Sequence, residues 1–179
     1  TIEKNTFKNN QLSFISIPAG IDRVEPGAFE NNQIRTVVLP EQITYVSGFK
    51  NNNLKSINIP NSVVEIGWKA FENNPLESVV FGNSLEIIGS GAFRNTKIKT
   101  LSFPESLQEI DSWAFFKSNL KSIVIPDSVT EIGEKAFQDN QIESVIFPKH
   151  LEKIKGQTFK QNNITSVVIP ESVTYVGYE

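Results

Sequence analysis

A phenylalanine recurs at a nearly fixed interval along this chain, and no other feature limits the possible folds as strongly. The successive intervals are 22, 20, 22, 22, 22, 22 and 22 residues. Self-similarity at a period of about 20–50 residues is typical of solenoids, in which each repeat buries its apolar face against its neighbours. The members of the series are Phe7, Phe29, Phe49, Phe71, Phe93, Phe115, Phe137 and Phe159. The whole chain is therefore predicted to be one repeat array.

A second series, of proline, keeps the same spacing and marks the end of a strand in each repeat. In the repeat at residues 127–148, Val145 and Phe147 alternate with Ser144 and Ile146. Side chains of a β-strand point alternately to its two faces, so the first pair is predicted to face inward and the second outward. The proline that follows has no N–H to give to a β-ladder, so the strand ends there. The series is Pro18, Pro40, Pro60, Pro104, Pro126, Pro148 and Pro170, with Gly82 in the one gap.

The other half of the repeat predicts a short extended segment on the opposite side of the coil. Residues 129–133 carry apolar side chains at fixed places, and we expect Gly133 to adopt a backbone conformation that other residues resist. Residues 134–138 are too few for a helix, so we expect a single helical or 3₁₀ turn. Phe137 is predicted to fill the centre of its coil.

A small polar residue stands three positions after each phenylalanine. Stacked one per coil, these side chains are predicted to bond the otherwise unpaired backbone of each bend. Ligand recognition is the alternative, but a slot that recurs in every coil favours the structural role. The residues are Asn10, Asn32, Asn52, Asn74, Thr96, Ser118, Asn140 and Asn162.

The complete unit, P-x-S-V-x-x-I-G-x-x-A-F-x-x-N-x-I-x-S-V-x-I-P, resembles the BspA-like leucine-rich repeats over essentially the whole chain. The third repeat, at residues 46–49, lacks two residues, and Gly82 replaces a proline. The resemblance implies a right-handed leucine-rich-repeat solenoid, with one parallel β-strand per repeat of about 22 residues and short extended and 3₁₀ or helical turns on the convex side. In bacteria it also implies a secreted or surface-anchored protein that serves adhesion.

Composition argues against several other classes of protein. With 17 basic and 20 acidic residues and a net charge of −3, the chain lacks the basic excess of a nucleic-acid binder. No apolar run reaches the length of about 18 residues that a membrane span needs. The absence of cysteine excludes disulfides and thiolate sites, and a lone histidine, His150, argues against zinc. We therefore expect no metal, no cofactor, no nucleic-acid partner and no membrane span in this segment.

The outward strand positions form the candidate ligand-binding surface. Neighbouring strands lie about 4.8 Å apart, so equivalent residues should form columns, with Val124, Ile146 and Val168 adjacent. An exposed apolar strip bordered by hydroxyls suits a protein partner. The alternative is that β-branched residues simply favour strands. The candidate residues are Val80, Ser102, Val124, Ile146, Val168, Ser122, Ser144 and Ser166.

Two groups of residues on the opposite side of the coil are weaker candidates for a functional site. Trp68 and Trp113 precede the core phenylalanine and are expected to pack there, with an aromatic contact role as the alternative. Glu109, Asp111 and Glu131 are expected to cluster on a solvated face. Without a cysteine and with one histidine the chain lacks a nucleophile and base pair, so we predict no catalytic residues.

These observations predict a single array of about eight repeats over residues 1–179, with partial repeats at both ends, as a segment of a longer protein. The first functional hypothesis is a non-catalytic, extracellular or cell-surface recognition module that binds a host matrix or cell-surface protein, with a glycan as the second candidate ligand. The alternative is a structural spacer that holds another domain away from the cell wall. An enzyme is the remote third.

Overall fold

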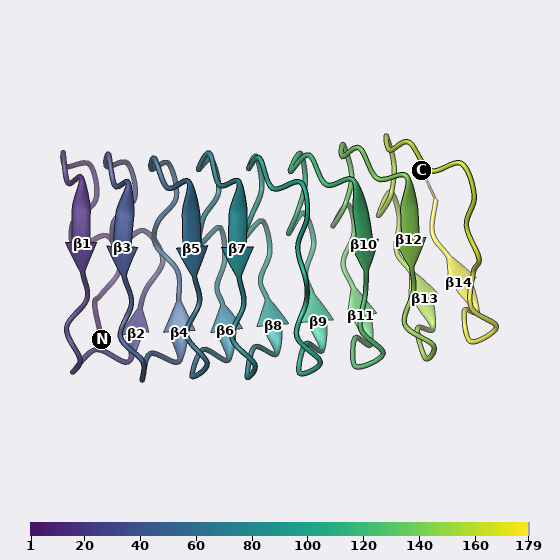
Figure 1. Ribbon diagram of the computed structural model, residues 1–179, viewed down its shortest axis with the longest axis horizontal. Coiled ribbons are helices and arrows are strands. Elements are labelled where there is room, and N and C mark those ends of the chain that lie inside the picture. Colours follow the sequence, from purple (N-terminus) through teal and green to yellow (C-terminus); the bar gives the residue numbers. More distant parts are fainter. Residues whose placement is uncertain (179) are drawn as a thin grey trace.

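The computed structural model describes residues 1–178 and shows parallel β-strands stacked as a solenoid of about seven turns (Figure 1). The strands form two rows. The long-strand row has three residues per strand: β1 (Phe14–Ser16), β3 (Thr36–Val38), β5 (Ser56–Asn58), β7 (Ser78–Val80), β10 (Ser122–Val124) and β12 (Ser144–Ile146). The short-strand row has two: β2 (Arg23–Val24), β4 (Tyr45–Val46), β6 (Glu65–Ile66), β8 (Ile87–Ile88), β9 (Glu109–Ile110), β11 (Glu131–Ile132), β13 (Lys153–Ile154) and β14 (Tyr175–Val176).

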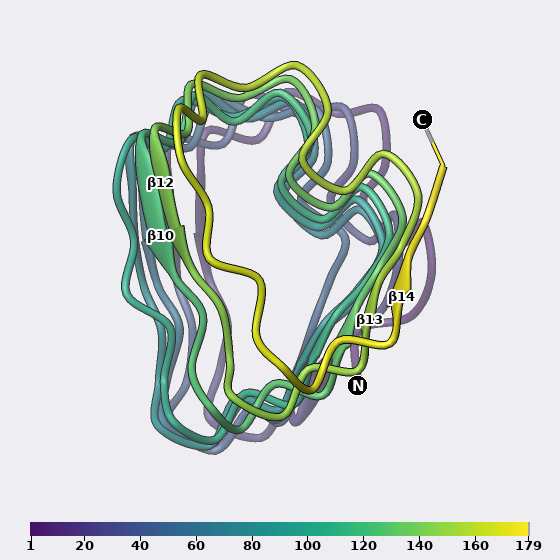
Figure 2. The ribbon, with the colours of Figure 1, turned by 90° about the vertical axis from the view of Figure 1, so that its right-hand side faces the viewer.

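Strands of successive coils pair in parallel within each row. The short-strand row contains a six-stranded sheet in the order β11-β9-β8-β6-β4-β2, and a separate pair β13-β14. The long-strand row pairs in three pieces, β1-β3, β5-β7 and β10-β12. Viewed along the solenoid, β10 and β12 lie on one wall of the coil and β13 and β14 on the other (Figure 2). The predicted parallel solenoid, with an extended segment opposite each strand, is therefore confirmed.

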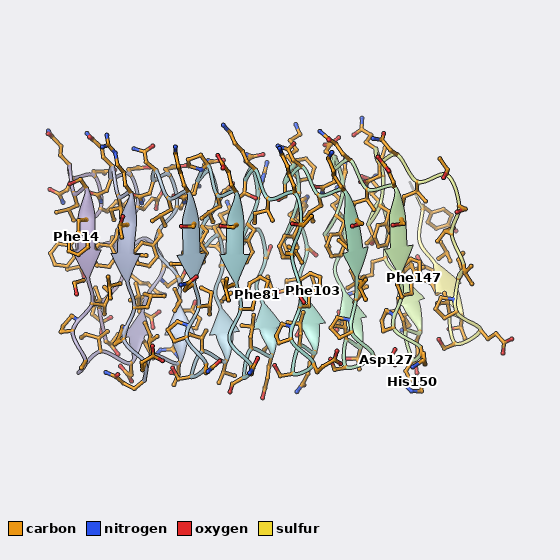
Figure 3. The ribbon with its side chains drawn as sticks, viewed as in Figure 1. Phe14, Phe81, Phe103, Asp127, Phe147 and His150 are labelled. Atoms are coloured by element: carbon orange, nitrogen blue, oxygen red, sulfur yellow. The ribbon has the colours of Figure 1, made fainter. Side chains whose placement is uncertain are left out.

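The recurring phenylalanines form one continuous stack through the core. Neighbouring rings have centroids 5.3–5.8 Å apart and interplanar angles of 2–17°, from Phe7 to Phe159. Three further phenylalanines, Phe81, Phe103 and Phe147, meet members of this stack edge to face (Figure 3). The repeat brings one ring per coil to the same depth, and the stacked coils exclude water from all but the ends.

The polar residue three positions after each phenylalanine bonds backbone, as predicted. It is buried from Asn32 to Asn140, whereas Asn10 is exposed and Asn162 half-buried in the coils at the two ends. Asn52 shows the pattern: its Oδ1 accepts a hydrogen bond from Ile34 N at 3.0 Å, and its Nδ2 donates to Phe29 O at 2.9 Å and Phe49 O at 3.1 Å. Each side chain thus joins two coils. The same bonds recur at Asn32, Asn74, Asn140 and Asn162.

The turn before each core phenylalanine differs from the prediction. Ala136 N donates to Gly133 O at 3.3 Å, but Lys135 between them has a left-handed φ of 59°. A positive φ at the third residue belongs to a type II β-turn and is incompatible with a 3₁₀ or α-helical turn. Within residues 1–178 no residue is helical. The expected helical turn is therefore wrong, because the chain must reverse within too few residues to follow a helix.

Gly133 is required for a different reason from the predicted one. It is not among the glycines with a left-handed φ. A Cβ at this position would lie 2.1 Å from the Ser112 backbone nitrogen and 2.6 Å from its Cα. The glycine therefore allows the backbone of one coil to lie directly against the backbone of the previous coil.

We predict that Gly133→Ala lowers the free energy of unfolding by about 1–3 kcal/mol, the usual result of overpacking, because the backbone it would strike directly follows β9 of the six-stranded sheet. Gly20→Ala is the matched control, since no atom lies within 4 Å of a Cβ added there. Urea unfolding of both variants measures the difference. Equal stability of the two would contradict the close approach of the coils.

Candidate functional site

The outward residues of the long-strand row are exposed, as the alternation predicts. Val80, Val124 and Ile146 keep 60, 60 and 61% of their surface accessible, although the residues beside them in each strand pack inward. Ser122 and Ser144 are exposed too. The row therefore presents apolar side chains and hydroxyls together on a backbone that the core holds in place.

Strand pairing brings part of the predicted column together. In the β10-β12 pair, Val124 is the register partner of Ile146, and Ser122 that of Ser144. Two apolar side chains thus lie side by side, with two hydroxyls beside them on the same face. This is the arrangement that the sequence predicted for the C-terminal half of the surface.

Three of the predicted residues lie outside the paired strands. Ser102, Ser166 and Val168 are all exposed but belong to no β-ladder. The last coil departs from the line of β10 and β12 (Figure 2), and Val168 is 86% exposed. The expected continuous column of Val124, Ile146 and Val168 is therefore wrong at its last member, because residues 166–168 do not pair with β12.

A hollow of about 550 Å³ lies at the other half of the long-strand row, which the sequence analysis did not single out. Its lining combines apolar and polar groups of β3, β5 and the end of β7: Thr36, Val38, Ser56, Asn58 and Val80 among others. Only Val80 was among the predicted residues. A hollow depends on how side chains of three coils meet, so the pattern of one repeat does not reveal it.

The acidic group on the short-strand row forms as expected. Glu109 and Glu131 are register partners on β9 and β11, and Lys155 forms an ion pair with Glu131. Burial raises the pKa of the Glu109 carboxyl, and the neighbouring Asp111 and Glu131 carboxylates raise it further. The cluster is a partly solvated set of carboxylates balanced by a lysine.

Among residues 1–178, neither His150 nor the acidic residues lie in a cluster that could bind a metal ion. His150 is exposed on a turn next to Lys149 and near Asp127 (Figure 3). Within residues 1–178, no three His, Cys, Asp or Glu side chains are placed to hold a metal ion. Over the same residues the structure contains no helix long and apolar enough to cross a membrane.

A second row of asparagines, which the sequence analysis missed, runs along the outer edge of the bends. Each has a left-handed φ, and each amide donates to the asparagine of the preceding coil: Asn31 Nδ2 to Asn9 Oδ1 at 2.7 Å, Asn51 to Asn31 at 2.6 Å, Asn73 to Asn51 at 2.7 Å and Asn95 to Asn73 at 2.8 Å. Asparagine tolerates this backbone conformation better than most residues. The doubled Asn-Asn after the first four phenylalanines of the series was the available signal.

Similarity to known proteins assigns the chain to a family. A family model described as the BspA type leucine rich repeat region matches residues 1–101 and 64–179, in six copies. The chain belongs to the BspA-type leucine-rich repeat family. The resemblance stated from the sequence is thus confirmed. A search of curated proteins finds no match.

Solved structures agree on the fold of this BspA-type chain. A leucine rich cell surface protein from Faecalibacterium prausnitzii is 22% identical, with a TM-score of 0.55 over 94% of this chain and 60% of its own. YopM from Yersinia enterocolitica is 18% identical, with a TM-score of 0.56 over 96% of this chain and 40% of its own. The chain therefore spans less than two thirds of either protein, and the likeness establishes the leucine-rich-repeat fold alone.

Proposed function

We propose that this BspA-type segment is a non-catalytic recognition module that binds a protein through the long-strand row. The observation that supports this most directly is that Val124 and Ile146 remain about 60% exposed although parallel strand pairing holds them side by side. Exposed apolar groups within a polar rim are typical of protein interaction sites. The hollow beside Val38, Asn58 and Val80 extends this surface along the same row.

We further propose that the module acts outside the cell, at the surface or secreted, and mediates adhesion to a host or neighbouring cell. Family membership supports this, together with the similarity to a bacterial protein described as a leucine rich cell surface protein. A host matrix or cell-surface protein is the partner we propose.

A structural spacer is the second candidate function. The unbroken phenylalanine stack and the six-stranded short-strand sheet favour it, since both resist bending along the solenoid axis. A spacer would be sensitive to the number of repeats and indifferent to the chemistry of Val124 or Ile146.

Binding to extracellular-matrix and epithelial surface proteins, measured with the paired variant Val124→Asp/Ile146→Asp, separates these functions. We expect the variant to bind its partner at least about tenfold more weakly, because two charges replace apolar contacts at the centre of the surface. Val38→Asp/Val80→Asp tests the other half of the row. Val64→Asp, at an exposed valine beside the short-strand row, is the control. Unchanged affinity of both double variants would contradict the proposal and favour the spacer.

A further inference from the structure

A small hollow lies on the opposite side of the coil, between the two tryptophans of the chain. Its volume is about 190 Å³, and it is lined by Trp68, Lys69, Ser90, Gly91, Arg94 and Trp113. Trp68 and Trp113 are 54 and 37% exposed, so neither indole ring is buried in the core. The expectation that both simply pack against the coil is therefore incomplete.

The hollow exists because the middle coil contributes a glycine. Lys69, Gly91 and Trp113 occupy the same position in three successive coils, two residues before the core phenylalanine, and all three have a left-handed φ. Gly91 has no side chain to fill the space between its neighbours. Two coils separate the indoles, a distance of about 10 Å at the usual strand spacing.

The surroundings of the hollow carry an excess of positive charge. Lys50, Lys69 and Arg94 approach one carboxylate, that of Glu72, with N–O distances of 3.1, 3.8 and 3.7 Å. Glu72 is 5% exposed, so it is a fixed internal counter-charge. Three cations around one buried anion leave an excess of positive charge, and two of the cations, Lys69 and Arg94, line the hollow itself. Within residues 1–178, the buried Nε of Arg94 has no hydrogen-bond partner.

The aromatic faces already have cations beside them. Lys69 Nζ lies 4.4 Å from the Trp68 ring centroid, and Lys135 Nζ lies 5.4 Å from that of Trp113. These lysines would repel a cationic ligand, so the site opposes one.

We propose that this hollow binds an anionic sugar residue of a glycan. The C–H face of the sugar ring packs on an indole, and its carboxylate or sulfate accepts hydrogen bonds from Lys69 and Arg94. A hollow of about 190 Å³ holds one sugar ring, whereas a stable protein partner needs about 800 Å² of surface on each side. The size of the hollow therefore favours a single sugar over a protein, and charge complementarity favours an acidic sugar over a neutral one. This site is independent of the long-strand row.

The two tryptophans provide a direct readout, because the chain has no others. We would titrate the protein with four oligosaccharides: a uronate-containing one without sulfate, a sulfated heparin fragment, sialyllactose and neutral chitotetraose. Tryptophan fluorescence and the two indole N–H signals in NMR are recorded. We expect saturable shifts of both with at least one acidic oligosaccharide, at least about tenfold weaker binding of the neutral one, and a fall in affinity with added salt. The three acidic ligands distinguish carboxylate from sulfate recognition.

Two substitutions test the site without removing a core group. Gly91→Asn fills the gap with a residue that tolerates the left-handed φ, and Arg94→Gln removes one cation. Each should weaken binding of the acidic ligand at least about tenfold. Lys160→Gln, at the position of Arg94 three coils further on, should leave the affinity unchanged, as should Val124→Asp/Ile146→Asp.

Several outcomes would overturn the proposal. One is the absence of any saturable tryptophan shift up to millimolar ligand. Others are equal binding of neutral and acidic oligosaccharides, or full affinity in both Gly91→Asn and Arg94→Gln while the circular dichroism spectrum shows the native fold. Binding of a protein that depends on Trp113, without binding of any of the four oligosaccharides, would also contradict it.

Discussion

Phe137→Ala is expected to lower the free energy of unfolding by about 3–5 kcal/mol, the usual loss when a buried aromatic side chain is truncated. Phe137 is fully buried, and its ring stacks on Phe115 and Phe159 with centroids 5.5 Å away on both sides. Removing it leaves a cavity that neither neighbouring ring can fill, since each is held in turn by its own coil. The variant thus loses the transfer free energy of the ring and contacts on both of its faces.

Urea unfolding followed by far-ultraviolet circular dichroism measures this loss. Phe14→Ala is the matched control, because Phe14 lies in β1 with its ring largely exposed (Figure 3). The control should lose less than about 1 kcal/mol. A loss below about 1 kcal/mol for Phe137→Ala would contradict the central place of the stack in the stability of the fold.

Asn52→Ala should cost about 2–4 kcal/mol, the second largest effect we expect, although it removes no apolar group. The substitution leaves Ile34 N without its side-chain partner. It also removes one of the two asparagine amides that donate to each of Phe29 O and Phe49 O, which keep those of Asn32 and Asn74. A buried polar group left unpaired costs about 1–3 kcal/mol. Some of this loss is recovered where water reaches the site.

Asn53→Ala tests whether burial is the cause. Asn53 follows directly in the chain and is exposed. Its alanine variant should be within about 0.5 kcal/mol of the native protein. Hydrogen exchange at the Ile34 amide should increase strongly in Asn52→Ala and little in Asn53→Ala. Similar stabilities of the two variants would refute the role of the buried asparagine column.

The candidate binding surface was predicted in part. The alternation of inward and outward residues identified Val80, Val124 and Ile146 as exposed, because that alternation follows from strand geometry alone. It also placed Val168 beside Ile146, which is wrong, because pairing depends on the path of the next coil. Ser102, equally well placed by the pattern, lies in a coil that contributes no strand to the long-strand row.

The bends between strands were the least predictable part. Their left-handed residues include Lys69, Trp113, Lys117 and Lys135, which no general preference assigns to that conformation. The coil imposes it, since each bend must return the chain to the same depth within a few residues. The two-residue deletion in the third repeat is absorbed there as well, at Gly48, whose φ is 86°.

The amino-acid sequence by itself determined the length of the coil, the side chains that enter the core and the buried asparagines, because these follow from one unit repeated along the chain. Only the tertiary structure decided which strands pair, where Glu72 collects its three cations and that Gly91 opens a hollow between two indoles. Apart from the Lys69–Glu72 pair, those features join residues about one repeat or more apart. Their contacts depend on how the backbones of neighbouring coils stack, and the sequence of a single repeat does not specify which side chains the next coil places beside it.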